Sequence, residues 1–335
     1  MRLLHPDEVK YTPRRRSFLG LAAAAAAASG ARAQTTLPDK TLRLLVGFQA
    51  NGGTDVCCRL IATQLERRLG RRVVVENKPG GSGGLPGQLI AKGPPDGTTL
   101  AFLASTTLVA KLGPTEFPFD PMNDLLAVSL AGTWPMGLAV SPKIDVATFP
   151  EYLAYLKAGD AERQKFGNTA SDAFINAFNR LFGKELGVTM HGVTYRGTGP
   201  MVNDLAEGRL PAAVSGIVSL LEHHRGKRIK LLTTTGPKRL AVAKDIPTIR
   251  ELGFPGLEVT EWFGFFATPG TPEPLVAEWN RHISAVLADP NLAGSLAQVG
   301  MEAGSSTPQE ARDHLARHLK EWRARMRAVG IQPSN

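Results

Sequence analysis

The sequence of 335 residues predicts an α/β fold with parallel sheets of the doubly wound type. Three observations predict it. Short apolar or β-branched runs alternate with stretches of helical periodicity, polar and glycine-rich turns separate the two, and the last third is helical. An apolar content of 43% is typical of a globular protein with a sizeable core.

The first 33 residues have the pattern of an export signal. The run 15–19 (RRSFL) precedes an alanine stretch at 22–28, and 31–33 (ARA) is a small-x-small cleavage motif. The apolar stretch is too short to span a membrane. Because the paired arginine is followed by x-Phe-Leu, the twin-arginine route is favoured over a general secretory signal. We expect cleavage after Ala33 and a mature protein in the periplasm.

The predicted elements follow one another in order along the mature chain. Strands are expected at 42–48, 73–75, 98–104, 139–140, 165–167, 188–194, 212–214 and 229–233. Helices are expected at about 55–69, 149–158, 171–186, 199–207, 220–224 and 275–287, with a short one ending at Ile90. A last helix begins at a capping box, Thr307 with Glu310, and ends at Gly330.

Charge and cysteine usage exclude several classes of protein. The formal charge is +9, but residues 1–33 carry +4 of it, which leaves about +5 for the remainder. Apart from the cluster 223–228 (HHRGKR) the basic residues are scattered, so no nucleic-acid partner is expected.

Cys57 and Cys58 are adjacent within a helical pattern. We expect them to be buried thiols, neither a disulfide framework nor a metal site.

Motifs of catalysis are missing from the sequence. There is no H-E-x-x-H, and Ser215 does not stand in G-x-S-x-G. His191, His223 and His224 have no spaced partner that the sequence identifies. The glycine-rich run 79–87 lacks the P-loop lysine, which favours a tight connection over a phosphate loop. We therefore expect no cofactor and no enzymatic activity.

Several strand-to-helix turns are rich in small polar residues instead. They are 51–55, 105–107, 167–171 and 196–199. Backbone amides at helix N-termini bind carboxylates or phosphates without a catalytic group. In open α/β sheets such turns gather at the carboxyl ends of the strands, where ligands lie. The alternative is that Ser, Thr and Asp only cap helices. Several such turns in one exported chain favour a binding cleft.

Six motifs in register resemble one family, the solute receptors of tripartite tricarboxylate transporters, also called the Bug family. They are 48–55 (FQANGGTD), 73–80 (VVVENKPG), 95–100 (PDGTTL), 195–197 (YRG), 245–248 (DIPT) and 262–267 (WFGFFA). The resemblance covers essentially the whole mature chain.

The resemblance implies a type II periplasmic binding protein, with two α/β lobes and a ligand cleft between them. The first lobe would comprise residues 35–138 plus 268–335, the second 139–260, and a crossing segment 261–267 would join them. Such a receptor closes on a small organic acid and delivers it to the membrane subunits of a transporter.

Carried over turn by turn, the resemblance implies a set of ligand contacts. They are Phe48, Thr54, Asp55, Ser105, Thr106, Asn168, Thr169, Tyr195, Arg196 and Thr198. Asp55 is expected to cap its helix and not to touch an anion. Arg196 either pairs with a distal carboxylate or is a solvated surface residue.

Departures from the family pattern bear on the ligand. Asp172 and Phe174 add a negative charge and bulk where a carboxylate often binds, and Pro211 and Ser215 stand where aspartates are common. Glu261 replaces a residue that is usually small. If these residues face the cleft, an acidic lining repels a tricarboxylate. Asp172 and Ser215 therefore join the candidate ligand contacts. We expect a smaller monocarboxylate, for example one that carries an aromatic ring or an amine.

Two rival functions stay open at this point. One is an exported enzyme on the same architecture, which turnover of a candidate ligand would reveal. The other is a sensory receptor that signals to a membrane kinase, for which the binding chemistry would be identical.

Overall fold

The computed structural model describes residues 37–113, 116–168, 172–195 and 197–334. Leu37–Asn335 form one compact unit. The predicted export signal and its cleavage site lie outside the described residues. None of the described helices is both long and apolar enough to cross a membrane.

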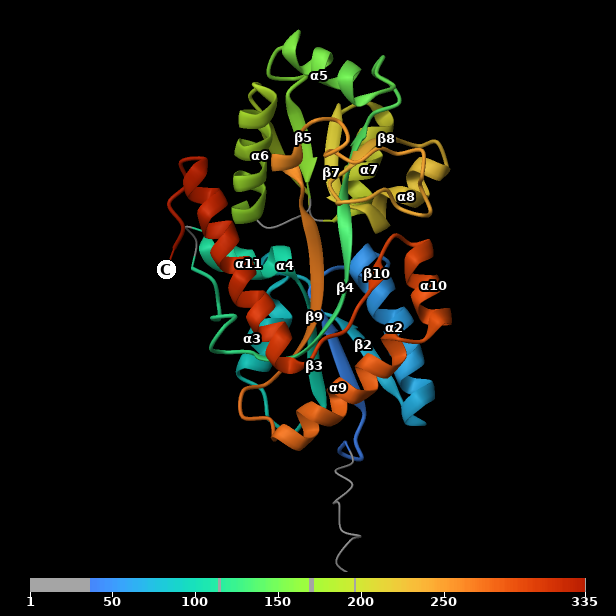
Figure 1. The fold of residues 1–335 in the computed structure, drawn as a ribbon, viewed down its shortest axis with the longest axis vertical. Helices are drawn as coiled ribbons and strands as arrows, with labels where there is room; N and C mark the ends of the chain where they lie inside the picture. The colour runs from blue at the N-terminus through green and yellow to red at the C-terminus, as the bar shows by residue number, and fades with distance from the viewer. Residues whose placement is uncertain (1–36, 114–115, 169–171, 196, 335) are drawn as a thin grey trace, which may run out of the picture. The chain divides into compact units, whose positions relative to one another are not determined.

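The strands form one sheet in the order β2-β1-β3-β9-β4-β7-β5-β6, and β8 and β10 also pair with β4 (Figure 1). Their bounds are β1 (Leu42–Val46), β2 (Val73–Asn77), β3 (Thr99–Ala104), β4 (Leu126–Val140), β5 (Lys165–Asn168), β6 (His191–Thr194), β7 (Ala212–Gly216), β8 (Lys230–Thr234), β9 (Thr260–Ala267) and β10 (Glu302–Ala303). β1 pairs in parallel with β2 and β3, and β5 with β6 and β7. The predicted parallel pairing is confirmed for these strands.

β4 and β9 run antiparallel to their neighbours and hold the sheet together (Figure 1). β4 pairs with β9 over residues 126–135 and with β7 over 136–140. The sequence predicted only 139–140 of this strand. Gly132, Pro135 and Gly137 interrupt the pattern, and Pro135 stands at the end of the pairing with β9, where its missing N–H is tolerated.

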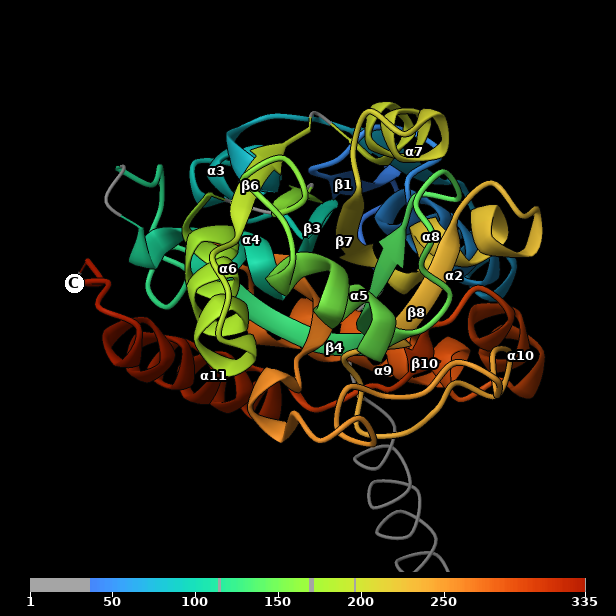
Figure 2. The ribbon, with the colours of Figure 1, turned by 90° about the horizontal axis from the view of Figure 1, so that it is seen from above.

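The helices lie on both faces of the sheet (Figure 2). Their bounds are α2 (Gly53–Leu69), α3 (Leu85–Ala91), α4 (Ser105–Val109), α5 (Phe149–Lys157), α6 (Asp172–Leu186), α7 (Thr198–Glu207), α8 (Ile217–Arg225), α9 (Glu273–Leu287), α10 (Pro290–Gln298) and α11 (Pro308–Ala328), with short 3-10 turns η1 (Gly81–Gly83), η2 (Ala110–Leu112) and η3 (Pro255–Leu257). The capping box of Thr307 and Glu310 is confirmed at α11. Asp289 and Pro290 follow the end of α9 and begin α10, where the Asp289 side chain accepts the Asn291 N–H.

Two hydrophobic cores cover the two faces of the sheet. Alternate residues of one strand belong to different cores: Phe102 of β3 packs with α2 and α9, whereas Leu103 packs with α4 and α11. Cys57 and Cys58 are fully buried in the first core, as predicted, and burial raises the pKa of both thiols. Residues of β4 and β9 belong to both cores. Each core therefore continues from the parallel strands β1, β2 and β3 to the parallel strands β5, β6 and β7.

Candidate ligand-binding site

The turn between β1 and α2 is held by a buried carboxylate. Asp55 accepts hydrogen bonds from the Asn51 N–H at 2.9 Å, from Arg59 Nε at 2.9 Å and from Asn77 Nδ2 at 2.8 Å. Burial raises the pKa of Asp55, but the hydrogen bonds from Arg59, Asn51 and Asn77 outweigh it and the net pKa is lowered. Asp55 therefore holds the turn before α2 with both carboxylate oxygens, but the expectation that it caps the helix is wrong, because the N-cap is Gly52 and has no side-chain cap.

Phe48 is packed against the glycine-rich connection between β2 and α3. Gly83 has a φ of +84°, and a Cβ there would lie 2.6 Å from Thr107 Oγ1 and 2.7 Å from Phe48 Cζ. A Cβ on Gly47 would collide with the Gly83 carbonyl. Thr107 Oγ1 donates to the Ser82 carbonyl at 3.0 Å. The run 79–87 is thus a tight connection that packs against Phe48 and against the start of α4.

The starts of α2 and α8 meet. A Cβ on Gly53, the first residue of α2, would lie 3.0 Å from Ser219 Oγ and 3.0 Å from Val218 Cβ. A Cβ at this position would be a tight contact that Val218 and Ser219 could accept only by shifting a few tenths of an ångström. Gly53 follows β1, whereas Val218 follows β7, so the contact joins turns from the two sets of parallel strands.

The start of α4 is joined to β4 and β9 through Glu261. Thr106 Oγ1 donates to Glu261 Oε1, and Trp134 Nε1 donates to Glu261 Oε2 at 2.6 Å. Burial raises the pKa of Glu261, and the hydrogen bonds from Thr106 and Trp134 only partly offset it. Ser105 Oγ accepts the Trp262 N–H at 3.2 Å. Sequence reasoning identified Glu261 but missed Trp134, because an isolated Trp in a broken strand pattern carries no signal.

The carboxyl ends of β5, β6 and β7 lie side by side. Asn168 is opposite Thr194 of β6 and Val214 of β7, and its carbonyl accepts the Tyr195 N–H at 2.9 Å. The Tyr195 hydroxyl donates to Asp204 Oδ2 at 2.8 Å. Burial, followed by this hydrogen bond, raises the pKa of Tyr195 to about 12.

Trp134 links this second group of turns to the first. A Cβ on Gly216 would lie 2.8 Å from Trp134 Nε1, so the indole touches the N-cap of α8 next to Ser215. Ser215 itself is buried opposite Gly137 of β4. The structure thus brings the turns that follow β1, β3 and β7 into one connected group.

Helix starts in this group lack side-chain caps. The N-caps of α2, α7 and α8 are Gly52, Gly197 and Gly216, and none has a side-chain cap hydrogen bond. By contrast Thr148 and Asp289 cap α5 and α10 with their side chains. At these starts, the alternative that Ser, Thr or Asp only caps the helix is wrong. The first backbone N–H groups are left for another acceptor.

The remaining predicted contacts divide into two kinds. Thr54 and Thr198 stand in the first turns of α2 and α7. Thr169 and Arg196 lie outside the described residues, as does the side chain of Asp172. Phe174 is fully buried and stacks on Phe178 and Trp322, so the expectation that it adds bulk at the ligand is wrong.

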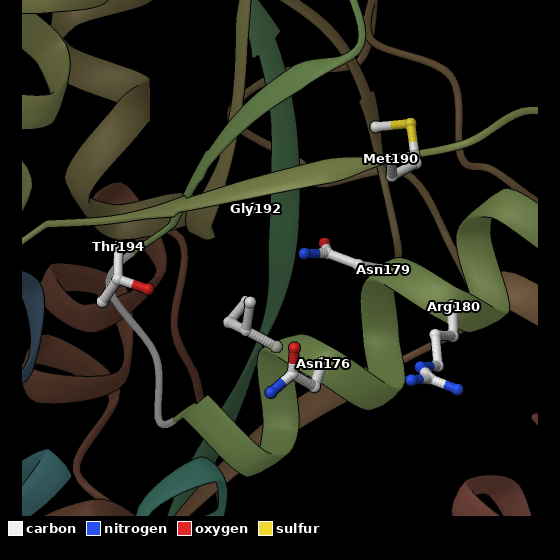
Figure 3. A pocket seen from close by; sticks show the side chains of 7 residues that line it. Asn176, Asn179, Arg180, Met190, Gly192 and Thr194 are labelled. Atoms are coloured by element: carbon white, nitrogen blue, oxygen red, sulfur yellow. The ribbon is translucent and has the colours of Figure 1, made fainter. Parts of the chain in front are cut away.

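A hollow of about 180 Å³ lies elsewhere, between α6 and β6 (Figure 3). It is lined by Ile175, Asn176, Asn179, Arg180, Met190, Gly192 and Thr194. Figure 3 shows Asn179 directed from α6 towards the strand. None of the predicted contacts with a described side chain lines it. Within the described part of the chain, no group of three His, Cys, Asp or Glu residues could hold a metal ion.

A family model described as "Tripartite tricarboxylate transporter family receptor" matches residues 57–331. The chain belongs to this family. Protein BugT of Bordetella pertussis is 29% identical over 319 residues, covering 94% of this chain and 97% of that protein. The UPF0065 protein in the gbd 5' region of Cupriavidus necator is 31% identical over 326 residues, covering 95% and 98%.

Solved structures of the tripartite tricarboxylate receptor type share the fold. Periplasmic binding protein BugD is 25% identical with a TM-score of 0.81, covering 88% of this chain and 99% of that one. R. palustris Rpa4515 with adipate is 28% identical with a TM-score of 0.84, covering 89% and 100%. MatC from Rhodopseudomonas palustris with bound malate is 27% identical with a TM-score of 0.78, covering 86% and 99%. The predicted periplasmic-binding-protein fold is confirmed, and this chain is a solute-binding receptor of that family.

Proposed function

We propose that this receptor binds a small organic carboxylate among the starts of α2, α4, α7 and α8 and delivers it to the membrane subunits of a tripartite tricarboxylate transporter. One observation carries the proposal: three of these starts have glycine N-caps without a side-chain cap. Their free N–H groups and helix dipoles favour an anion. The adipate and malate bound by two structural relatives are anions of this kind.

The proposed cleft lies where the two lobes meet. The lobes would comprise residues 35–138 with 268–335 and 139–260, joined through 261–267 in β9. β4 would be the second crossing strand, since it pairs with β9 at one end and with β7 and β8 at the other. Contacts across this junction include Gly53 against Val218, Trp134 against Gly216, and Phe174 of α6 against Trp322 of α11. A hinge at β4 and β9 would let the lobes close on a ligand.

We favour a monocarboxylate over a di- or tricarboxylate. Glu261 is a buried acidic group next to the start of α4. This group already takes the donors of Thr106 and Trp134, which disfavours a second carboxylate of the ligand at this point. The ligand contacts that we propose are those predicted from the sequence. Asp55 is the exception, because it contributes by holding the turn before α2 in place.

A thermal-shift screen tests the proposal. The full chain is expressed in a bacterial host, recovered from the periplasm and screened against mono-, di- and tricarboxylates with matched amides as controls. Binding to the folded state alone stabilises it by about 2.7 kcal/mol at a hundredfold excess over the dissociation constant. Shifts with carboxylates and none with the amides support the proposal; shifts with neither, or with amides equally, contradict it. Mass spectrometry of the recovered protein checks cleavage after Ala33.

A further inference from the structure

Glu261 of β9 carries a buried carboxylate whose three hydrogen-bond donors come from two other elements, α4 and β4. The residue is on β9, opposite Trp134 of β4, and is 7% exposed. Trp134 Nε1 binds one oxygen at 2.6 Å, and the hydroxyl of Thr106 in α4 binds the other. The backbone N–H of Thr106 adds a third donor.

In the described part of the chain, only neutral donors meet this carboxylate. Hydrogen bonds from Thr106 and Trp134 act on Glu261, and no lysine, arginine or histidine charge does. Converging hydroxyl, indole and amide donors are what a binding site offers to the carboxylate of a ligand. In this protein the carboxylate that meets these donors belongs to Glu261 and not to a ligand.

The donors belong to the proposed cleft. Thr106 is in the turn after β3, beside Ser105, whose Oγ accepts the Trp262 N–H at 3.2 Å. The Trp134 indole touches Gly216, the uncapped start of α8. A ligand bound across the starts of α4 and α8 would therefore meet Glu261 at one end.

We propose that Glu261 is a built-in occupant of a carboxylate position, and that it sets the specificity of the receptor by filling donors that would otherwise bind a second carboxylate of the ligand. This inference rests on the proposed function, because it assumes a carboxylate cargo in this cleft. The cargo then places its own carboxylate at the other uncapped starts. The group next to Glu261 is apolar or a hydrogen-bond donor.

Removal of the occupant provides a test that does not require the cargo. Glu261→Ala leaves the Thr106 and Trp134 donors around an empty space of carboxylate size. We expect formate, at tenfold above its dissociation constant, to raise the melting temperature of Glu261→Ala by about 2–4 °C. Sodium chloride at the same ionic strength is the control. The wild-type protein and the isosteric variant Glu261→Gln keep this space filled, so any shift with formate, which would then report binding at the helix starts alone, should be clearly smaller.

A second variant ties the effect to the donors. Trp134→Phe in the Glu261→Ala background removes one donor and should weaken or abolish the response to formate. If Glu261→Ala does not fold unaided, refolding from urea with and without formate is measured by tryptophan fluorescence. Recovery that depends on formate supports the proposal. No effect of formate on either stability or refolding overturns it.

Specificity is measured with hexanoate and adipate, which have the same carbon chain and differ by one carboxylate. We expect calorimetry to show that Glu261→Ala shifts the preference towards adipate by about tenfold or more relative to wild type, or about 1.4 kcal/mol. An unchanged ratio, with formate inactive, overturns the inference while the carboxylate receptor stands. If wild type binds no carboxylate but formate stabilises Glu261→Ala, the proposed function fails and the built-in occupant is supported.

Discussion

Several polar side chains around the proposed cleft form hydrogen bonds with other residues of the protein. Asp55 holds Asn51 and Asn77, Ser105 accepts a backbone N–H from Trp262, and Tyr195 donates to Asp204. Bound in this way, these side chains shape the turns. The groups that we propose for the ligand are therefore the backbone N–H groups of the helix starts.

Asp55→Ala tests this division of roles at one residue. Asp55 is fully buried, and the change leaves the Asn51 N–H, one N–H of the Asn77 amide and Arg59 Nε without this acceptor. We expect the free energy of unfolding to fall by about 2–3 kcal/mol. Urea unfolding measures it, with Asp39→Ala, an exposed aspartate, as the matched control. Equal effects of the two substitutions would refute the role of Asp55.

At the scale of elements, two features position the cleft: the glycine connection under Phe48, and α11, which packs on both β4 and β9. Gly47 and Gly83 let the turn after β1 pack on the glycine connection, which in turn lies against Thr107 in α4. On α11, His318 packs edge-on against Trp262 and Trp322. Each feature makes a separate prediction.

Gly47→Ala should misplace the turn that carries Phe48. Its Cβ would collide with the backbone carbonyl of Gly83, which cannot move without shifting Phe48 and Thr107. We expect a loss of about 2 kcal/mol or more of stability and at least a tenfold loss, roughly 1.4 kcal/mol, of ligand affinity. Calorimetry and urea unfolding measure the two effects. Gly304→Ala is the control, since a Cβ there meets no atom within 4 Å; a Gly47→Ala protein that behaves like it would contradict the packing argument.

His318 should make the protein sensitive to acid. Burial, followed by the nearby His314 and Arg325, lowers the pKa of His318 from 6.5 to about 3. The folded state therefore binds a proton less readily than the unfolded state, so stability is full above pH 6.5 and falls as the pH drops from 6.5 towards 3. In His318→Leu this part of the decline should vanish.

Melting temperatures across this range measure the effect. His191→Leu, at an exposed histidine of β6, is the control and should keep the wild-type slope. A His318→Leu protein that declines as steeply as wild type on acidification would contradict the assignment.

At the scale of the whole molecule, β4 and β9 contribute to both hydrophobic cores and join the two sets of parallel strands, since β9 pairs with β3 and β4 pairs with β7. A ligand that binds helix starts on both sides of these strands would stabilise both at once. The starts concerned are those of α2 and α4 after β1 and β3, and those of α7 and α8 after β6 and β7.

Hydrogen exchange with and without ligand tests this two-sided binding. We expect slower exchange at 53–57, 105–109, 198–202 and 217–221 together. The segment 290–298 in α10, whose start is capped by Asp289, is the internal control and should not change. Protection limited to one pair of starts would contradict binding across the two sides.

Local sequence determined much of this protein. Features that depend on neighbouring residues could be predicted from periodicity and turn chemistry. They are the alternation of strands and helices, the capping box at Thr307, the buried cysteines and the family motifs. Gly52 and Gly197 stand in turns that the sequence analysis singled out, but Gly216 does not, and nothing local indicated that the starts of α2 and α8 would meet.

Only the tertiary structure decided the rest. β4 forms in spite of Gly132, Pro135 and Gly137, because pairing with β9 on one side outweighs a poor local pattern. Glu261 meets donors 155 and 127 residues away, in Thr106 and Trp134. Phe174 packs into the core and not into the cleft. Contacts between residues so distant in the chain leave no periodic trace in the sequence, since chain folding alone brings them together.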